Sequence, residues 1–408
     1  MNPASARPEG KTWLDGHPDP LADFPGLLDC VHCGLCLPVC PSYRLSGKET
    51  DSPRGRIALL RGAAENRLKP DDIVPALDRC LLCRACETVC PSRVPYHRLV
   101  EQQREGLPPA WILRSQRRWL SSAAGIRLAG IMLRSLRSLG ILGLVERFAP
   151  RRLRAMAGTV PLAPHRFRPQ EALFRPAHPP RRGRVGLHLG CVQAEFFGQV
   201  LEDTIAVLQQ QGFDVEIPPQ VPCCGSLAAH NGDAAEGRRM ADRTLQAFDP
   251  QLDAVLIPAA GCLGHLQEFD RRRPCHDPAV FLFERGLRGR LRPLTQRLAY
   301  DPPCHLSFVA GKSDVVTALL HSLPGVELRH HDEADTCCGA GGVAFLRQPE
   351  QSQALLQQKI DRLLAVDPEV IVSGNPGCQM RLEAGLRQRN VSVPVVHPIQ
   401  LLRKALSI

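Results

Sequence analysis

The sequence predicts an α+β multidomain protein, in which a helical N-terminal domain precedes a duplicated α/β domain. At 408 residues the chain exceeds the usual size of one domain, so two or three packed units are expected. Two cysteine runs near the N-terminus are separated by a stretch with helical apolar spacing. From Arg184 onward, short apolar runs alternate with helical stretches in the rhythm of βαβ units, and the whole pattern occurs twice.

The N-terminal domain is defined by its cysteines. The chain has seventeen, which indicates a reducing compartment in which thiols stay free to bind metal. Two runs of the form C-x2-C-x2-C-x3-C-P begin at Cys30 and Cys80. This spacing is typical of proteins with two [4Fe-4S] clusters, where the last cysteine of each run serves the other cluster. We expect the first cluster to be held by Cys30, Cys33, Cys36 and Cys90 and the second by Cys80, Cys83, Cys86 and Cys40.

The residues between the two runs are expected to form helices. RGRIALLRGAAENRL and PDDIVPALDRC have the apolar spacing and the Ala and Leu content that suit helices. We therefore expect a mainly helical ferredoxin-like domain over residues 20–100. Zinc is the alternative metal, but a zinc site leaves the trailing Cys-Pro of each run without a role.

Residues 101–184 are expected to form a basic amphipathic helical segment followed by a linker rich in Pro and Arg. The chain has a net charge of +10, whereas residues 101–190 hold 17 Arg and 4 Glu. Because the charge is confined to one segment, we expect no nucleic-acid partner. Arginines interrupt the apolar stretch AGIRLAGIMLRSLRSLGILGLVERF, so we expect no membrane span. The helix lies on an anionic membrane surface, on a partner subunit or on its own protein.

The duplicated domain consists of repeat 1, residues 185–295, and repeat 2, residues 296–408. Each repeat has a single cysteine, then Cys-Cys-Gly, then another single cysteine, at nearly equal intervals. We expect these cysteines at the carboxyl ends of strands, where open α/β sheets build their sites. They are either retained thiols of a scaffold or candidates for a further metal or redox site: Cys191, Cys223, Cys224 and Cys262 in repeat 1, and Cys304, Cys337, Cys338 and Cys378 in repeat 2. Cys275 has no counterpart and is expected to be a plain thiol.

Three features together resemble the iron-sulfur subunits of bacterial glycolate oxidase. They are the run LDRCLLCRACETVCPSRVPYHRLVEQQRE, the segment DSPRGRI, and the duplicated PCCG and CCGAGG. The resemblance covers nearly the whole chain and implies a two-cluster ferredoxin domain followed by two cysteine-rich CCG domains.

The resemblance also implies a role in electron transfer. FAD-binding subunits oxidise glycolate to glyoxylate, and also D-lactate, and the iron-sulfur subunit relays the electrons to the respiratory quinone pool. It implies a cytoplasmic protein, peripheral on the inner face of the inner membrane. The N-terminus lacks the basic and apolar regions of a secretion signal, in agreement with that location. We find no convincing flavin or nucleotide motif, so we expect no flavin and no catalytic residue on this chain, which would be inactive alone.

Two positions depart from the related heterodisulfide reductase subunits. In those proteins each cysteine-rich domain ends in CxxC, which supplies a fifth cysteine to a cluster. Here the corresponding residues are His265 and Arg381. His265 is therefore a candidate extra ligand in repeat 1.

Two other functions are compatible with the same motifs. One is the iron-sulfur subunit of anaerobic glycerol-3-phosphate dehydrogenase, which shares the domain order. The other is a thiol or disulfide reductase that uses the cysteines of the duplicated domain. The segments DSPRGRI and VPYHRL favour glycolate oxidase.

Overall fold

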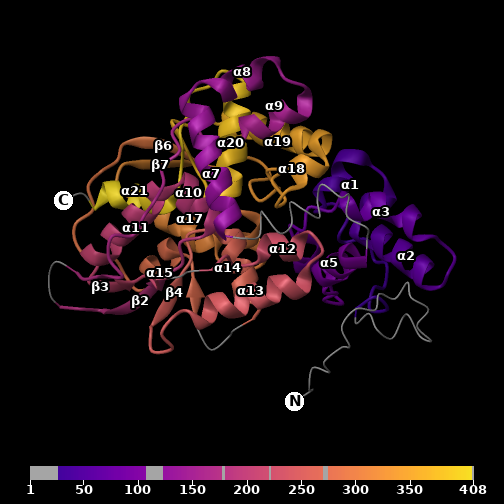
Figure 1. The fold of residues 1–408 in the computed structure, drawn as a ribbon, viewed down its shortest axis with the longest axis horizontal. Helices are drawn as coiled ribbons and strands as arrows, with labels where there is room; N and C mark the ends of the chain where they lie inside the picture. Colours follow the sequence, from indigo (N-terminus) through magenta and orange to yellow (C-terminus); the bar gives the residue numbers. More distant parts are fainter. Residues whose placement is uncertain (1–25, 107–122, 177–179, 220–221, 270–273, 407–408) are drawn as a thin grey trace.

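The structure is a computed structural model. It describes residues 26–106, 123–176, 180–219, 222–269 and 274–406. The N-terminal stretch, in which the sequence predicts no secretion signal, lies outside the described residues. The described chain consists of a helical unit on one side and a larger body of two sheets with their helices on the other (Figure 1).

The N-terminal unit is a bundle of short helices. They are α1 (Pro41–Ser46), the 3-10 helix η2 (Glu49–Asp51), α2 (Pro53–Ala64), α3 (Pro70–Asp78), α4 (Ala85–Thr88) and α5 (Tyr96–Gly106). Helix α2 begins sharply because Ser52 accepts a hydrogen bond from the backbone N–H of Gly55 and Pro53 occupies the first turn. Leu60, Leu77 and Leu99, each at most 1% exposed, form the core between the helices. The predicted helical ferredoxin-like unit is confirmed.

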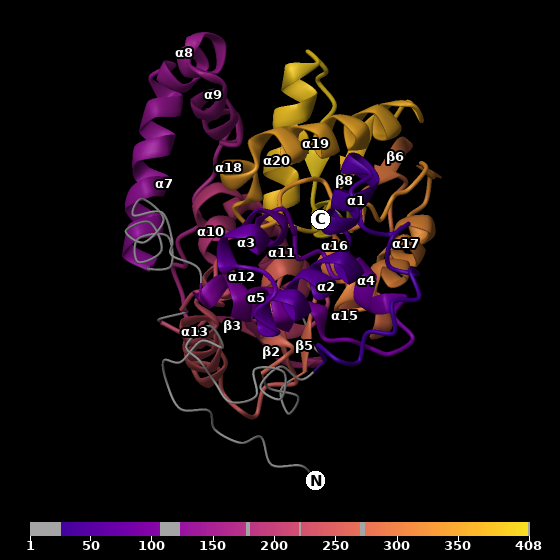
Figure 2. The same ribbon diagram turned by 90° about the vertical axis from the view of Figure 1, so that its right-hand side faces the viewer.

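Three helices form an arm beside repeat 1: α7 (Ala123–Ser138), α8 (Ile141–Phe148) and α9 (Arg151–Gly158). Gly140, with a φ of +73°, turns the chain between α7 and α8. The inner side chains Leu133, Leu142 and Val145 pack against the core of the duplicated domain. Arg387 of repeat 2 donates to the carbonyl oxygen of Gly158 at the end of α9, and the outer surface of the arm forms one edge of the molecule (Figure 2).

The arm also bears on the question of a membrane span. Among the described residues, no single helix has the length and apolar character to cross a membrane. The pair Arg127–Ser138 and Ile141–Phe148 meets those criteria only when taken together, and it is bent by 82°.

Repeat 1 has a five-stranded sheet in the order β1-β3-β2-β4-β5. Its strands are β1 (Leu173–Phe174), β2 (Gly183–Leu187), β3 (Phe213–Glu216), β4 (Ala254–Leu256) and β5 (Cys275–His276). Only β1 is antiparallel, and it lies in the segment expected to be a linker. The helices are α10 (Cys191–Phe196), α11 (Gly198–Gln210), α12 (Ser226–His230), α13 (Ala234–Gln246), α14 (Ala260–Leu266) and α15 (Pro278–Glu284).

Repeat 2 has a four-stranded parallel sheet in the order β7-β6-β8-β9. Its strands are β6 (Gln296–Tyr300), β7 (Val326–Arg329), β8 (Val370–Val372) and β9 (Val395–Val396). The helices are α16 (Cys304–Phe308), α17 (Ser313–Ser322), α18 (Ala344–Arg347), α19 (Pro349–Leu364), α20 (Pro376–Gln388) and α21 (Pro398–Ala405). The order of elements matches that of repeat 1, so the duplication seen in the cysteines extends to the whole fold.

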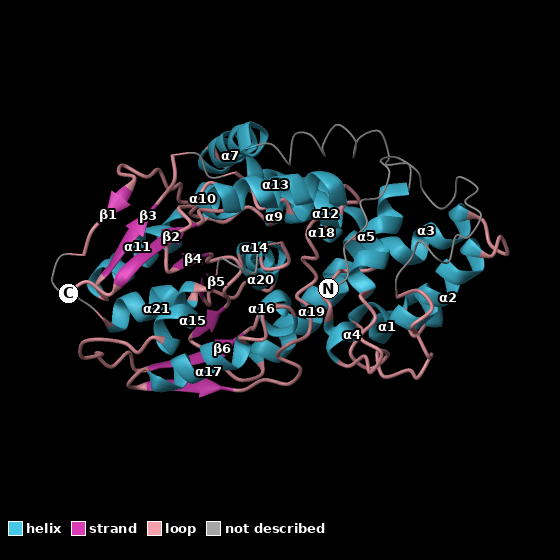
Figure 3. Cartoon of the chain, turned by 90° about the horizontal axis from the view of Figure 1, so that it is seen from below, coloured by secondary structure: helices cyan, strands magenta, loops and turns pink. Residues whose placement is uncertain are grey.

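The two repeats share one hydrophobic core. Helices α11 and α21 lie between the two sheets (Figure 3), and their buried leucines Leu208 and Leu402 belong to the same core cluster. Helices α14 and α20 meet where they begin: the backbone N–H of Gly261 donates to Oδ1 of Asn375 at 3.2 Å. The carboxyl ends of both sheets therefore face a common region.

The glycine of each Cys-Cys-Gly allows a close backbone contact. Gly225 and Gly339 have φ values of +87° and +82°, a left-handed conformation that other residues adopt at a cost. A Cβ on Gly225 would lie 2.3 Å from the carbonyl oxygen of Gly237, and one on Gly339 would lie 2.5 Å from that of Ser352. Helices α13 and α19 can approach the vicinal cysteines only because these residues are glycines.

This contact predicts a difference between two glycine substitutions. Gly286 has a similar φ of +77°, but a Cβ there would have open space. We expect Gly286→Ala to lower the free energy of unfolding by about 1–2 kcal/mol through backbone strain alone. Gly339→Ala should lower it by clearly more, because the backbone of α19 must also move. Chemical unfolding measures both losses, and equal losses would contradict the role assigned to Gly339.

Candidate metal centres

The two cysteine runs of the N-terminal unit adopt the same unusual backbone shape. In each run, the residues before and after the second cysteine have positive φ: 54° at His32 and 85° at Gly34, and 53° at Leu82 and 66° at Arg84. Three of these four are not glycine, and such strain is maintained mainly where the chain wraps a functional group. Backbone that alternates in this way can point successive N–H groups inward, as loops around iron-sulfur clusters do.

Each predicted set of four thiols faces one hollow. The first hollow is lined by Cys30, Cys33, Cys36 and Cys90, together with Cys86 and apolar neighbours. The second is lined by Cys40, Cys80, Cys83 and Cys86. The last cysteine of each run thus lies in the hollow of the other run. Pro53, Cys86 and Tyr96 line both hollows, so the two adjoin across a thin wall.

Arginines of DSPRGRI and of the following turn of α2 brace the cysteine loops. Arg54 donates to the carbonyl oxygen of His32 at 3.1 Å, and Arg61 donates to that of Cys30 at 3.1 Å. Arg56 is only 1% exposed and donates to the carbonyl oxygen of Ala76 at 2.7 Å. Arginines of α2 thus hold two carbonyl oxygens of the first loop and one of α3.

The two hollows differ in their access to solvent. Cys33 in the first loop is exposed, and the apolar side chains Leu28, Val31 and Leu35 around it are 61%, 69% and 54% exposed. In the second set, Cys40, Cys80 and Cys86 are buried. The first hollow therefore lies at the surface and the second in the interior.

The second hollow lies against repeat 2. Leu81 and Cys83 pack in one cluster with Cys337 and Ala344. A Cβ on Gly341 would lie 2.9 Å from Cδ2 of Leu81, so CCGAGG needs a glycine at this position to let the N-terminal unit approach. Burial is the main cause that raises the pKa of the Cys83 thiol, and the nearby Cys337 adds to it. Thiols of the two domains are thus neighbours.

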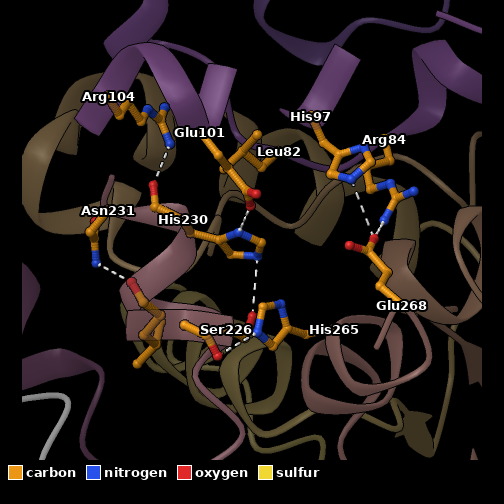
Figure 4. Close-up of polar contacts among 12 residues, drawn as sticks. Leu82, Arg84, His97, Glu101, Arg104, Ser226, His230, Asn231, His265 and Glu268 are labelled. Carbon is orange, nitrogen blue, oxygen red and sulfur yellow. Dashed lines mark hydrogen bonds and ion pairs between the residues drawn. The ribbon is translucent and has the colours of Figure 1, made fainter. Parts of the chain in front are cut away.

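Ion pairs attach the N-terminal unit to repeat 1 (Figure 4). Glu268, just after α14, pairs with Arg84, and its Oε1 lies 3.4 Å from Nε2 of His97. Nδ1 of His97 lies 2.8 Å from Oε1 of Glu87. Burial by itself would lower the pKa of His97, but the carboxylates of Glu268 and Glu87 outweigh it and raise that pKa to about 9. Burial opposes the charge on Glu268 too, yet His97 and Arg84 lower its pKa to about 2.

A second polar contact lies beside the first (Figure 4). Nδ1 of His230 in α12 lies 2.7 Å from Oε1 of Glu101 in α5, and Arg104 donates to the carbonyl oxygen of His230 at 2.8 Å. The ring of His230 is 5.7 Å from that of His305, which follows Cys304. The sequence includes His97 and Glu101 only within a run that carries the family resemblance, and it gives no sign of their contacts with Glu268 and His230, which lie far away along the chain.

The four predicted thiols of repeat 1 gather at the ends of β2 and β4. The sulfurs of Cys191 and Cys223 are 3.7 Å apart, and those of Cys224 and Cys262 are 3.1 Å apart. The hydrogen bond with Cys224 lowers the pKa of the Cys262 thiol to about 6, with a further contribution from His188. The hydrogen bond with Cys191 lowers the pKa of Cys223.

The pKa of the partner thiol in each pair of repeat 1 shifts the other way: hydrogen bonds with Cys223, together with burial, raise the pKa of Cys191 and of Cys224. Raised pKa values also occur in repeat 2. The hydrogen bond with Cys304 and burial raise the pKa of Cys337. The pKa of Cys378 is raised first by its hydrogen bond with Cys338 and then by burial, and Asp301 adds to the shift. Both repeats therefore hold buried thiols that hydrogen-bond to one another, with His188 beside those of repeat 1 and Asp301 beside those of repeat 2.

The structure places the remaining candidates as follows. Nε2 of His265 faces the carbonyl oxygen of Gly237 at 3.4 Å. At the equivalent point of repeat 2, Arg381 donates to the carbonyl oxygen of Ser352 at 3.3 Å. Cys275 is buried at the start of the edge strand β5. The histidine found close to the thiols of repeat 1 is His188, which sequence reasoning missed.

Comparisons with known families match these regions. The family model of the 4Fe-4S dicluster domain matches residues 26–94. That of the cysteine-rich domain matches twice, over residues 185–267 and 298–383. Both the cluster-binding character of the N-terminal unit and the duplication of the cysteine-rich domain are therefore supported by families of known proteins.

Similar whole proteins exist in several bacteria. A probable glycolate oxidase iron-sulfur subunit of Bacillus subtilis is 32% identical over 93% of this chain and 94% of its own length. The glycolate oxidase iron-sulfur subunit of Escherichia coli is 31% identical over 92% of this chain and 93% of its own. Lactate utilization protein A of Oceanobacillus iheyensis is 27% identical over 54% of this chain and 96% of its own.

The His97 contact predicts how stability depends on pH. Its folded pKa, about 9, lies above the ordinary value of 6.5. Charged His97 therefore stabilises the fold fully below about pH 6.5, and this contribution is lost as the pH rises through 9. The shift corresponds to about 3 kcal/mol. We expect His97→Gln to destabilise the chain at pH 6 and to change little at pH 10, as measured by chemical unfolding. An equal loss at both pH values would contradict the assignment.

Proposed function

This chain belongs to the family of glycolate oxidase iron-sulfur subunits, and on that premise we propose that it carries electrons from a flavin-binding subunit to an acceptor at the membrane. The observation that carries the proposal is the order of thiol sites: one at the surface, one in the interior, and one beyond it in repeat 2. Glycolate, and also D-lactate, would be oxidised on the partner that holds FAD. The respiratory quinone pool is the proposed final acceptor.

The residues of the N-terminal unit fit two [4Fe-4S] clusters. The first would be held by Cys30, Cys33, Cys36 and Cys90 and the second by Cys80, Cys83, Cys86 and Cys40. When bound, such clusters supply sites that accept and release one electron each. The positive φ values of the loops suit N–H groups directed at a bound cluster, and burial of the second hollow would keep water from it. These residues hold and shield the redox groups and perform no bond chemistry on the substrate.

The electron entrance is proposed at the first hollow. Leu28, Val31 and Leu35, here called the entry patch, surround the exposed Cys33. Among the described residues, all other exposed large hydrophobic side chains lie between Leu128 and Leu162. An apolar patch around an exposed thiol loop suits the docking of the flavin-binding subunit, because docking there removes water from the transfer path.

The arm α7–α9 is the proposed membrane contact. Ten of the thirteen exposed large hydrophobic side chains in the described chain lie between Leu128 and Leu162, and Leu139 and Phe148 are each 72% exposed. The exposed Arg127, Arg147 and Arg154 accompany them. Apolar side chains beside exposed arginines suit insertion into the boundary of an anionic bilayer. This supports a peripheral position on the inner face of the inner membrane.

The proposed role is tested with the purified flavin-binding subunit and this chain, combined without oxygen. We expect glycolate to bleach the iron-sulfur absorption of the chain only when the flavin-binding subunit is present. Leu28→Glu should slow that reduction several-fold, because a carboxylate weakens the apolar contact. Oxidation of glycolate by the purified chain alone would contradict the proposal.

The cluster assignment predicts the iron content. The anaerobically purified chain should hold about eight irons in the N-terminal unit, at four per cluster. Cys90→Ser should remove the cluster signal of the first hollow and leave that of the second in electron paramagnetic resonance. Cys275→Ser is the matched control, because Cys275 is a buried cysteine outside both hollows. Loss of the same iron from the control would contradict the assignment.

The arm and the entry patch are expected to serve two separable functions, membrane binding and reduction by the flavin-binding subunit. Leu144, in the arm, is 61% exposed, as is Leu28 in the entry patch. Leu144→Glu should reduce binding to vesicles of anionic lipid several-fold and leave reduction by the flavin-binding subunit unchanged. Leu28→Glu should slow reduction by the flavin-binding subunit and leave vesicle binding unchanged. Vesicle sedimentation measures the binding, and bleaching of the iron-sulfur absorption measures the reduction. If Leu144→Glu instead weakens binding of the flavin-binding subunit, the arm is a protein contact and the membrane proposal is wrong.

A further inference from the structure

The two repeats differ at the residue that follows the first strand of each sheet. His188 comes directly after β2 and three residues before Cys191. Asp301 comes directly after β6 and three residues before Cys304. The two positions are therefore equivalent in the duplicated fold, and each side chain is buried behind the vicinal cysteines, at 1% and 2% exposure.

In repeat 2 this position is completely partnered. Oδ1 of Asp301 lies 3.1 Å from Nζ of Lys359, whose side chain is 1% exposed. Ser373 donates to Oδ2 of Asp301 at 3.1 Å, and Lys359 donates to the carbonyl oxygen of Ala334 at 2.7 Å. A buried carboxylate and ammonium are thus held by each other and by neutral groups. Nothing more is needed to explain these polar side chains.

In repeat 1 the equivalent position lacks such a partner. In the part of the chain that the structure describes, neither Nδ1 nor Nε2 of His188 meets an oxygen or nitrogen partner, and its polar neighbours are the thiols of Cys224 and Cys262. Thr244 lies in α13 of repeat 1, in the place that Lys359 has in α19 of repeat 2, and it donates to the carbonyl oxygens of Pro222 and Cys223 instead. A thiol is a weak hydrogen-bond partner, so burying the imidazole in this place costs stability. A ligand that binds the ring nitrogen would remove that cost.

The groups next to His188 are the ones that bind soft metals. One ring nitrogen of His188 and the sulfurs of Cys224 and Cys262 lie within 4.8 Å of one another. The sulfurs of Cys191 and Cys223 lie in the same site and can supply further thiolates. Thiolate and imidazole together are the preferred donors for zinc and for iron, and the ligands of one such ion lie about this close.

We propose that repeat 1 holds a transition-metal centre for which His188 is a nitrogen ligand beside the thiolates of Cys224 and Cys262. Repeat 2 has a carboxylate paired with Lys359 at this position, so it offers no equivalent nitrogen ligand there. The inference assigns the histidine ligand to His188 and not to His265, whose Nε2 faces a backbone carbonyl. It does not depend on glycolate oxidation, because the metal is measured on this chain alone.

Two substitutions test the proposal. The full chain is produced without oxygen with iron and zinc supplied, and bound iron, zinc and sulfide are counted. We expect His188→Leu to lose one metal centre. The loss is one zinc ion if the centre is a single zinc, iron alone if it is a single iron, and iron together with sulfide if it is a cluster. His188→Cys should retain it, because a thiolate replaces the imidazole. His265→Leu, which removes another buried histidine of repeat 1, is the matched control and should retain it as well.

Stability separates loss of a ligand from loss of the fold. In the metal-free chain, His188→Leu should raise the melting temperature, because it removes from the interior a ring whose polar neighbours are thiols, which are weak hydrogen-bond partners. In the metal-loaded chain, the same substitution should lower the melting temperature. A metal content in His188→Leu equal to that of the original chain would overturn the proposal.

A further measurement needs no substitution. X-ray absorption at the zinc edge, or nitrogen couplings in pulsed electron paramagnetic resonance for iron, should show an imidazole nitrogen bound to the metal. The N-terminal cysteines offer no nitrogen ligand in either predicted set, so they do not imitate this signal. All-sulfur coordination, or no metal beyond the two N-terminal clusters, would refute the assignment of His188.

Discussion

The position of the thiols depends on backbone packing behind the two vicinal cysteine pairs. Gly225 and Gly339 take a left-handed conformation, and the carbonyl oxygens of Gly237 and Ser352 occupy the space that a side chain would need. This contact sets α13 and α19 directly against the Cys-Cys turns and directs the thiols toward the strand ends. The rest of the site follows from it, because the same turns form the surface on which the N-terminal unit packs.

The duplication has produced two halves with similar backbones and different electrostatics. Repeat 2 places an acid and a lysine behind its thiols and adjoins the second hollow through Cys337. Repeat 1 places a histidine there and holds the N-terminal unit through Glu268 and His230. Repeat 2 also pairs with the N-terminal unit, through Glu333 with Arg44 and through Arg347 with Asp78. Polar contacts from both halves therefore fix the orientation, and repeat 2 adds the thiol contact. An internal repeat can diverge in this way because each half retains its own core strands and helices.

Much of this arrangement was predictable, and the failures have physical causes. The C-x2-C-x2-C-x3-C-P spacing predicts which thiols share a hollow, because the loop and the crossing cysteine are local properties of the run. The edge strand Leu173–Phe174 was missed since two residues between prolines and arginines show no alternation. His188 and Glu268 were missed because their significance comes from neighbours distant in sequence. The CxxH pattern drew attention to His265, whose Nε2 the fold turns toward the carbonyl oxygen of Gly237.

The burial of the second hollow has a consequence for how the protein matures in the cell. Cys40, Cys80 and Cys86 are all buried, and Leu81 and Cys83 lie against repeat 2. On the proposed assignment, a preformed four-iron group would not reach these thiols after the two domains have docked. Loading of the inner site would therefore precede closure of the domain interface, whereas the outer site would stay open to repair. Damage by oxygen would accordingly be reversible at Cys33 and its neighbours, and at the inner site only after partial unfolding.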